Sequence, residues 1–306
     1  MSGTKQDNTK RILDGMSEED YNQNLNYLAG IPSFQAAESF SLPEEARAVM
    51  TEEAATKLAE FFDILKLDYK NDENLKDTPF RVASMYINEL MIGRYTNPPR
   101  IEAFPADMYV GKNTVDSRYV KGHKIIMSQL QEIETNLYKP ECLKTNELLM
   151  KSESLLEELD KLKEECDITK PDIQTVVAKT IDINSLCSHH LISFVSTDDK
   201  DSKCTITYIP TLGSEKALLG ISKLQRVADW FGRRPQLQEE LNWQIKAFVS
   251  LILRSSDVMV SFSNIIHYCE KTRGVESHCG STSSVVFSGR FKDAENRKLA
   301  YELTRN

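Results

Sequence analysis

Long apolar runs are missing from this sequence of 306 residues. No stretch approaches the ~20 consecutive apolar residues that a membrane-spanning helix needs, so we expect no membrane partner. The first fifteen residues, MSGTKQDNTKRILDG, are polar and lack the apolar centre of a secretory signal peptide. The sequence therefore predicts a cytoplasmic protein.

An excess of positive charge is also missing. The chain has 38 Lys and Arg residues against 46 Asp and Glu residues, which gives a net charge of −8. General nucleic-acid binding favours a broad basic surface, so nucleic acid is not an expected partner. A few local Lys and Arg residues are still enough to make a basic pocket for an anionic substrate.

Cysteine is scarce, and its spacing does not indicate the disulfide framework of a secreted protein. In a reducing compartment, metal-binding or catalytic roles become more plausible for some cysteines. The six residues are Cys142, Cys166, Cys187, Cys204, Cys269 and Cys279. We interpret Cys142 and Cys166 as packing residues of a helical segment and Cys204 as a core residue of a strand.

The chain divides into four parts by its patterning. Residues 1–40 are polar and weakly patterned, which predicts a flexible tail with a short helical piece near Tyr21–Leu28. Residues 41–120 form an N-terminal helical region, because apolar residues recur at helical spacing. One helix is expected over residues 43–67, and a second runs from Pro79, a residue suited to the first turn.

Residues 121–170 have the pattern of two helices joined by a turn at Lys139-Pro140-Glu141. The seams are Ile126, Leu130, Ile133 and Leu137 in the first helix, and Leu148, Ser152, Leu155, Leu159 and Leu162 in the second. Two interpretations stay open: a solvated hairpin that packs on itself, or a contact arm for another subunit or protein.

Residues 171–306 change to a pattern rich in β-branched residues. They predict helices over 222–231 and 235–255, and strands over 173–183, 191–197, 203–209, 257–268 and 283–291. This order predicts an α+β fold, with an antiparallel β-sheet and helices packed on one face.

Two short segments hold thiol and imidazole groups together. Cys187-Ser188-His189-His190 places Cys187 and His190 three residues apart, so a tight turn is needed to bring them to one ion. His267-Tyr268-Cys269 stands at the end of a predicted strand, where residues two apart share a face.

Two thiolates and one imidazole would leave one position of a tetrahedral zinc ion for water, as in catalytic sites. Zinc lowers the pKa of bound water to about 7. Two alternatives stay open from the spacing alone. One alternative is a closed structural site formed by His190, His267 and both cysteines. The other is that the histidines are ordinary polar residues and the cysteines are buried apolar residues.

Local cations indicate an anion site. Ser222, Lys223 and Arg226 open a predicted helix, where N–H groups and the helix dipole favour phosphate. Lys271 and Arg273 follow Cys269 within four residues. Arg81 is a further candidate. The alternative is that these residues are solvated surface charges.

Four segments together resemble the GTP cyclohydrolase I family, and the resemblance spans most of residues 45–115 and 173–306. The segments are DTPFRVASMYINEL (77–90), CSHHLISF (187–194), GISKLQRVADWFGRRPQLQEELNWQI (220–245) and HYCEKTRGV (267–275). Their occurrence in the family's order is more specific than any one motif.

The resemblance implies the tunnelling fold, in which subunits join their sheets into a barrel, and a homo-oligomer, typically a decamer, with active sites between subunits. It implies conversion of GTP to 7,8-dihydroneopterin triphosphate and formate. Cys187, His190 and Cys269 would bind Zn²⁺, and zinc-bound water would attack C8. His189 would donate and accept a proton near N7, and His267 would assist the water.

The resemblance also implies the substrate contacts. Glu239 would accept hydrogen bonds from the guanine N1–H and exocyclic amine, with Gln238 beside it. The triphosphate would contact Arg81, Ser222, Lys223, Arg226, Lys271 and Arg273. In the family, the counterpart of Arg81 comes from a neighbouring subunit.

The sequence departs from the family pattern in three places. Ser188 replaces a usual Glu, residues 121–170 replace a much shorter connection, and residues 281–288 contain less threonine. A pterin synthase or a 7-deazaguanine nitrile reductase of the same fold is a competing hypothesis. A catalytically silent, zinc-stabilised regulatory or binding subunit is another, but His189, His267 and Glu239 favour the active enzyme.

Overall fold

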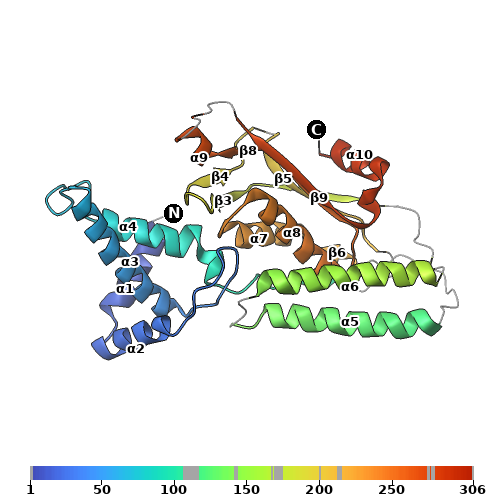
Figure 1. Ribbon diagram of the computed structural model, residues 1–306, viewed down its shortest axis with the longest axis horizontal. Helices are drawn as coiled ribbons and strands as arrows, with labels where there is room; N and C mark the ends of the chain where they lie inside the picture. Colours follow the sequence, from blue (N-terminus) through green and yellow to red (C-terminus); the bar gives the residue numbers. More distant parts are fainter. Residues whose placement is uncertain are drawn as a thin grey trace.

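The computed structural model describes residues 3–105, 117–140, 144–166, 168, 175–199, 201–211, 216–273, 276 and 280–304. The fold is α+β. A β-sheet is covered on one face by helices α7 and α8, the hairpin α5–α6 lies beyond them, and an N-terminal helical bundle stands at one side (Figure 1). No helix in the described ranges is both long enough and apolar enough to cross a membrane.

The main sheet has the strand order β2-β5-β8-β4-β3-β7, with β9 paired to β8. All described pairings in it are antiparallel except β3 with β7, so the sheet is mixed rather than purely antiparallel as predicted. The strands are β2 Val177–Ile181, β3 Asn184–Cys187, β4 Ser193–Val195, β5 Lys203–Tyr208, β7 Pro235–Gln236, β8 Val258–His267 and β9 Thr282–Phe287. A separate pair joins β1 (Ala103–Phe104) to β6 (Leu218–Leu219).

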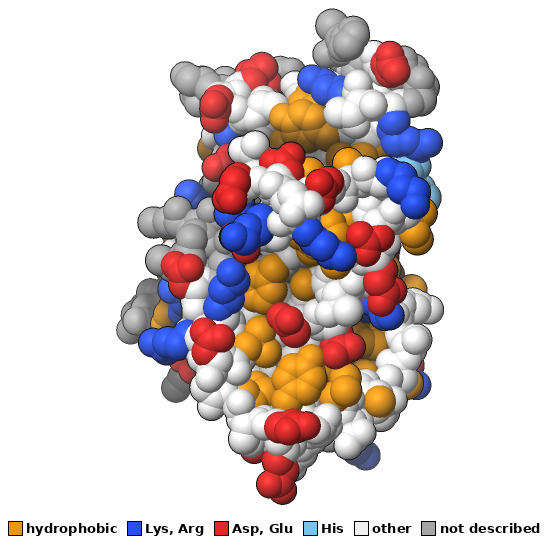
Figure 2. Space-filling model, turned by 90° about the vertical axis from the view of Figure 1, so that its left-hand side faces the viewer, with side chains coloured by type: hydrophobic (Ala, Val, Ile, Leu, Met, Phe, Trp, Pro, Cys, Tyr) orange, Lys and Arg blue, Asp and Glu red, His pale blue; other side chains and the backbone are white. Residues whose placement is uncertain are grey.

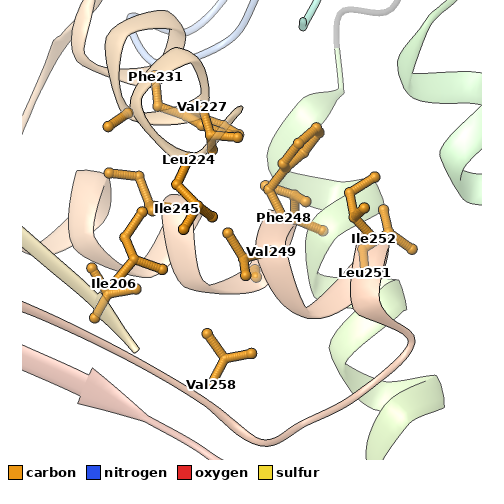
Figure 3. Packing of buried hydrophobic residues seen from close by; sticks show 14 of the residues in the cluster. Ile206, Leu224, Val227, Phe231, Ile245, Phe248, Val249, Leu251, Ile252 and Val258 are labelled. Carbon is orange, nitrogen blue, oxygen red and sulfur yellow. The ribbon is translucent and has the colours of Figure 1, made fainter. Parts of the chain in front are cut away.

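Helices α7 (Ile221–Gly232) and α8 (Gln238–Leu253) form the layer against the sheet. The buried side chains of α7 follow helical spacing, so a single apolar stripe faces the core. Figure 3 shows this packing, in which α7 and α8 meet above the sheet; the labelled residues are Ile206, Leu224, Val227, Phe231, Ile245, Phe248, Val249, Leu251, Ile252 and Val258.

The predicted hairpin is present as α5 (Ser117–Leu137) and α6 (Thr145–Glu165). It does not pack only on itself. Leu130 and Leu149 are fully buried and belong to the same hydrophobic core as α8. The interpretation as a solvated, self-packed hairpin is therefore wrong, because its inner face covers α8.

The N-terminal region contains α1 (Gly3–Asp14), α2 (Glu18–Ala29) and α3 (Glu44–Ile64). The sequence predicts a flexible tail over residues 1–40, whereas the structure has two helices there. Polar contacts hold them: Ser17 caps α2, and the Tyr21 hydroxyl donates to Glu53 at 2.9 Å. The short helical piece predicted near Tyr21–Leu28 lies within α2 and is confirmed, whereas α1 was not predicted. Helix α2 buries no residue, so apolar periodicity indicated only part of its length.

The second predicted helix of this region begins as α4 (Thr78–Met85). It continues through a π-helical turn, η1 (Tyr86–Leu90), and a 3₁₀ turn, η2 (Ile92–Arg94). At the other end of the chain, η3 (Gly289–Lys292) and α10 (Ala294–Glu302) follow β9.

A buried carboxylate ties the N-terminal region to the hairpin. Glu38 accepts hydrogen bonds from the backbone N–H groups of Thr145 and Asn146, the latter at 3.2 Å. Burial raises the pKa of Glu38, while these two N–H groups and Arg234 oppose the shift. The first N–H groups of a helix lack intrahelical acceptors and attract negative charge, so Glu38 caps α6.

We expect Glu38→Ala to lower the free energy of unfolding by about 1–2 kcal/mol, the usual loss when a helix cap is removed. Urea unfolding followed by circular dichroism measures it. Glu157→Ala is the control, because Glu157 is exposed on the same helix. Equal midpoints for the two variants would contradict the capping role of Glu38.

Candidate metal centre

A tight turn between β3 and β4 shapes the first half of the centre. The Cys187 N–H donates to the Ile192 carbonyl at 2.9 Å, and the Leu191 N–H donates to the Cys187 carbonyl at 2.8 Å. Leu191 has a φ of 54°, in the left-handed region. The chain thus reverses between Cys187 and Ile192, which brings the Cys187 thiol and the His190 imidazole to one side.

The second half comes from the end of β8. This strand ends at His267, which pairs with Phe194 of β4, and the short helix α9 (Tyr268–Lys271) follows. The prediction that Cys269 continues the strand and shares a face with His267 is therefore wrong. Cys269 instead reaches the turn between β3 and β4 from α9.

Three donor atoms converge here: the sulfurs of Cys187 and Cys269 and a ring nitrogen of His190 lie within 4.8 Å of one another. Two sulfurs bound to one tetrahedral zinc ion would be about 3.8 Å apart, given Zn–S bonds of about 2.3 Å. A small adjustment of the side chains would therefore close this set around an ion. Its thiol and imidazole chemistry suits a borderline-soft divalent metal such as zinc.

His267 lies outside this three-donor cluster and has a different partner. Its Nε2 is 2.8 Å from the Gln238 side-chain oxygen, and its ring stacks on Phe194 with centroids 4.8 Å apart. The Gln238 amide group in turn donates to Ser284 at 2.9 Å. Burial lowers the pKa of His267, opposed by nearby carboxylates including Glu239. Among the described residues, a closed site with both histidines is thus not formed.

The protonation tendencies of the cluster have clear causes. Local desolvation, followed by the charges of Arg273 and His189, lowers the pKa of His190, which favours the neutral imidazole that binds metals. Burial and the Cys187 thiol raise the pKa of Cys269. A bound cation reverses the second effect, because a coordinating thiol is deprotonated.

Two predicted polar residues approach the cluster directly. The His189 Nδ1 lies 3.8 Å from the Cys187 sulfur. The Arg273 guanidinium donates to the His190 Nε2. Lys271 ends α9, and Lys and Arg side chains gather beside histidine atoms at the upper right of Figure 2.

The other predicted anion-binding residues are not bonded to the cluster in the described part of the chain. Within the described ranges, no hydrogen bond or ion pair joins Ser222, Lys223 or Arg226 to it. Gly220 precedes α7 as its N-cap, so Ser222 and Lys223 lie in the first turn of the helix. Arg81 is exposed on α4 and pairs with Asp77 at 3.5 Å.

The sequence pattern missed three residues that shape the site. Phe194 lies against the His267 ring, Ser284 binds Gln238, and the Tyr86 hydroxyl donates to the Leu191 carbonyl at 3.1 Å. Each contact joins segments far apart in the chain, and no local signal identifies it.

The core role predicted for Cys204 is confirmed, since it is fully buried. Cys142, Cys279 and His278 lie outside the described residues.

We expect Cys269→Ala to weaken zinc binding at least about tenfold, since losing a group that only supports a ligand already costs about 10- to 100-fold. Competition with a chromophoric chelator measures the affinity. Cys166→Ala is the control, because Cys166 lies at the end of α6. Unchanged zinc affinity in Cys269→Ala would rule out this donor.

Comparisons with known proteins identify the family of the chain. The family model described as GTP cyclohydrolase I matches residues 123–305. Because the match runs through the hairpin, its status as an insertion stays a prediction.

Proteins named GTP cyclohydrolase 1 are 26% identical to the chain. The one from Pectobacterium carotovorum aligns over 248 residues, 81% of this chain and 79% of the relative. That from Serratia proteamaculans aligns over 245 residues, 80% and 77%. That from Salmonella choleraesuis aligns over 248 residues, 81% and 78%. The chain belongs to the GTP cyclohydrolase I family.

Proposed function

We propose that this protein is an active GTP cyclohydrolase I, which hydrolyses the imidazole ring of GTP at C8 and yields 7,8-dihydroneopterin triphosphate and formate. The observation that carries the proposal is the convergence of Cys187, His190 and Cys269 within 4.8 Å. Family membership supports the same reaction class.

Zn²⁺ is the proposed cofactor, held by Cys187, His190 and Cys269. Three protein donors leave one position of a tetrahedral ion open, which is the arrangement of catalytic zinc sites. When bound, zinc supplies a water molecule acidic enough to react as a nucleophile at neutral pH.

Two histidines serve as proton carriers in this proposal. His267 donates its Nε2–H to the Gln238 oxygen, which leaves Nδ1 to accept a proton from the attacking water. Stacking on Phe194 fixes the plane of the His267 ring. His189 is exposed beside Cys187, where it would carry the proton at the purine N7.

Glu239 is the proposed residue for recognition of the guanine base. It is the second residue of α8, exposed, and directly follows Gln238. Gln238 contacts the His267 ring at 2.8 Å, so the backbone places Glu239 next to a residue of the proposed reaction centre. Guanine presents two N–H donors on one edge, and a carboxylate offers two acceptor oxygens.

The triphosphate would be shared between copies of the chain. Lys271 and Arg273 stand beside the cluster, whereas Arg81 and the start of α7 would come from neighbouring copies. In the described part of the chain, Lys223 and Arg226 form no ion pair, which leaves both charges for a phosphate at the start of α7.

We infer a homo-oligomer, a decamer of the tunnelling-fold type, in which sheets from several copies join into a barrel. Apolar side chains next to the cluster are exposed in the single chain: Leu191 by 38%, Leu237 by 43% and Tyr268 by 42%. Their position beside polar site residues suits a contact with a neighbouring copy.

The proposed activity is tested by incubating zinc-loaded protein with GTP and following formate release and the pterin absorbance. We expect both products in equal amounts, and removal of zinc with a chelator should abolish them. A folded, zinc-loaded oligomer that releases neither product would instead support a silent subunit.

We expect Glu239→Ala to lower kcat/KM for GTP by about 100-fold or more, because two hydrogen bonds to a charged acceptor are lost. Zinc content should stay at the wild-type level, since Glu239 is not a donor. Glu132→Ala, which alters an exposed carboxylate on α5, is the control. Wild-type GTP kinetics in Glu239→Ala would refute its role in purine recognition.

A further inference from the structure

The first turn of α8 is bonded to the hairpin through one side chain, Asn146 of α6. The Asn146 amide group donates to the Glu240 carboxylate at 2.9 Å, and its oxygen accepts from the Gln244 amide at 2.7 Å. Glu240 and Gln244 are four residues apart and lie on the same face of α8. A single amide therefore spans one full turn at the start of this helix.

Asn146 is itself fixed from a third element. Its backbone N–H donates to Glu38 at 3.2 Å, the carboxylate that caps α6. The Asn146 side chain thus extends from a backbone position that is already held. A side chain anchored in this way loses little additional freedom when it forms its two hydrogen bonds.

The start of α8 depends on such outside contacts. Its N-cap residue, Leu237, makes no side-chain capping bond, so the helix lacks the usual support at this end. On the sheet side, Gln238 is held by His267 and Ser284. On the hairpin side, among the described residues of α6, Asn146 forms the side-chain hydrogen bond to this turn, through Glu240.

Glu239 lies between these two attachments and is exposed. Because no packing of its own fixes it, its position follows that of the turn. Other hairpin contacts meet α8 further along: Glu153 accepts from the Trp243 indole at 2.6 Å, and Glu134 pairs with Arg254 beyond the end of the helix.

We propose that Asn146 is a positioning residue for purine recognition: it fixes the first turn of α8 so that Glu239 faces the guanine edge. The proposal rests on the proposed function for the identity of the purine. It gives the hairpin a defined task at the site, at a residue that contacts neither substrate nor metal.

The test compares GTP with ITP, which lacks the exocyclic amine of guanine. We expect Asn146→Ala to lower the ratio of kcat/KM for GTP to that for ITP about fivefold, the equivalent of one hydrogen bond. Partial unfolding would lower both rates equally and leave this ratio unchanged. Asn136→Ala, on α5, is the matched control and should keep the wild-type ratio.

An exchange of the two polar groups sharpens the test. Asn146→Asp places a second carboxylate against Glu240, so the ratio should fall at least as far as in Asn146→Ala. Adding Glu240→Gln restores the hydrogen bond with its direction reversed, because the new amide at 240 donates to the new carboxylate at 146. The GTP-to-ITP ratio of the double variant should return to within about twofold of wild type. A wild-type ratio in both single variants would overturn the proposal.

Hydrogen exchange separates this inference from the proposed function. In Asn146→Ala, the amides of residues 241–245, whose acceptors lie in the first turn, should exchange faster, while those of residues 249–253 should not change. This readout needs no turnover, so it stands even if wild type does not convert GTP. Equal exchange in wild type and Asn146→Ala would exclude the positioning role.

Discussion

Helix α8 is buried along most of its length between the sheet and the hairpin, and the candidate site depends on how its polar side chains are held there. Gln244 and Lys246 are buried, and each buried polar group without a partner costs about 1–3 kcal/mol. The hairpin supplies partners: Asn146 accepts from Gln244, and Glu153 pairs with Lys246. The hairpin is therefore part of the core, and it stabilises the helix that begins with the candidate purine-binding residues.

The sheet connects this helix to the metal centre. Cys187 and Gln236 are register partners of β3 and β7, so the strand that ends in a candidate metal donor lies beside the strand that leads into α8. On the other side, Phe194 pairs with His267. A one-residue slip in either pairing would turn these side chains to the opposite face. The geometry of the site is therefore fixed by register within one sheet, not by the loops alone.

The sequence predicted the elements with regular apolar spacing and missed those without it. Periodicity located α3, α7, α8 and both hairpin helices. It gave only part of α2 and none of α1, which have polar contacts to α3 through Tyr21 and Asn8. The three candidate donors converge as the sequence predicted, and their role as metal ligands stays a prediction. The argument for Cys269 was wrong, because α9 has only four residues and is too short to produce a period. The contact of Asn146 with Glu240 joins residues 94 apart, and local patterning does not register such contacts.

The distribution of cations has a consequence for assembly under the proposed function. Lys271 and Arg273 lie at the candidate metal centre, while Lys223 and Arg226 form no hydrogen bond or ion pair with it among the described residues. Under the proposed function, the second group would come from a neighbouring copy, so one triphosphate that binds both groups would link two copies of the chain. A ligand that binds only the assembled form stabilises that form by mass action. Bringing together cations without carboxylate partners is unfavourable through their mutual repulsion, and a polyanion between them removes that cost. Substrate binding and subunit association would then be thermodynamically coupled.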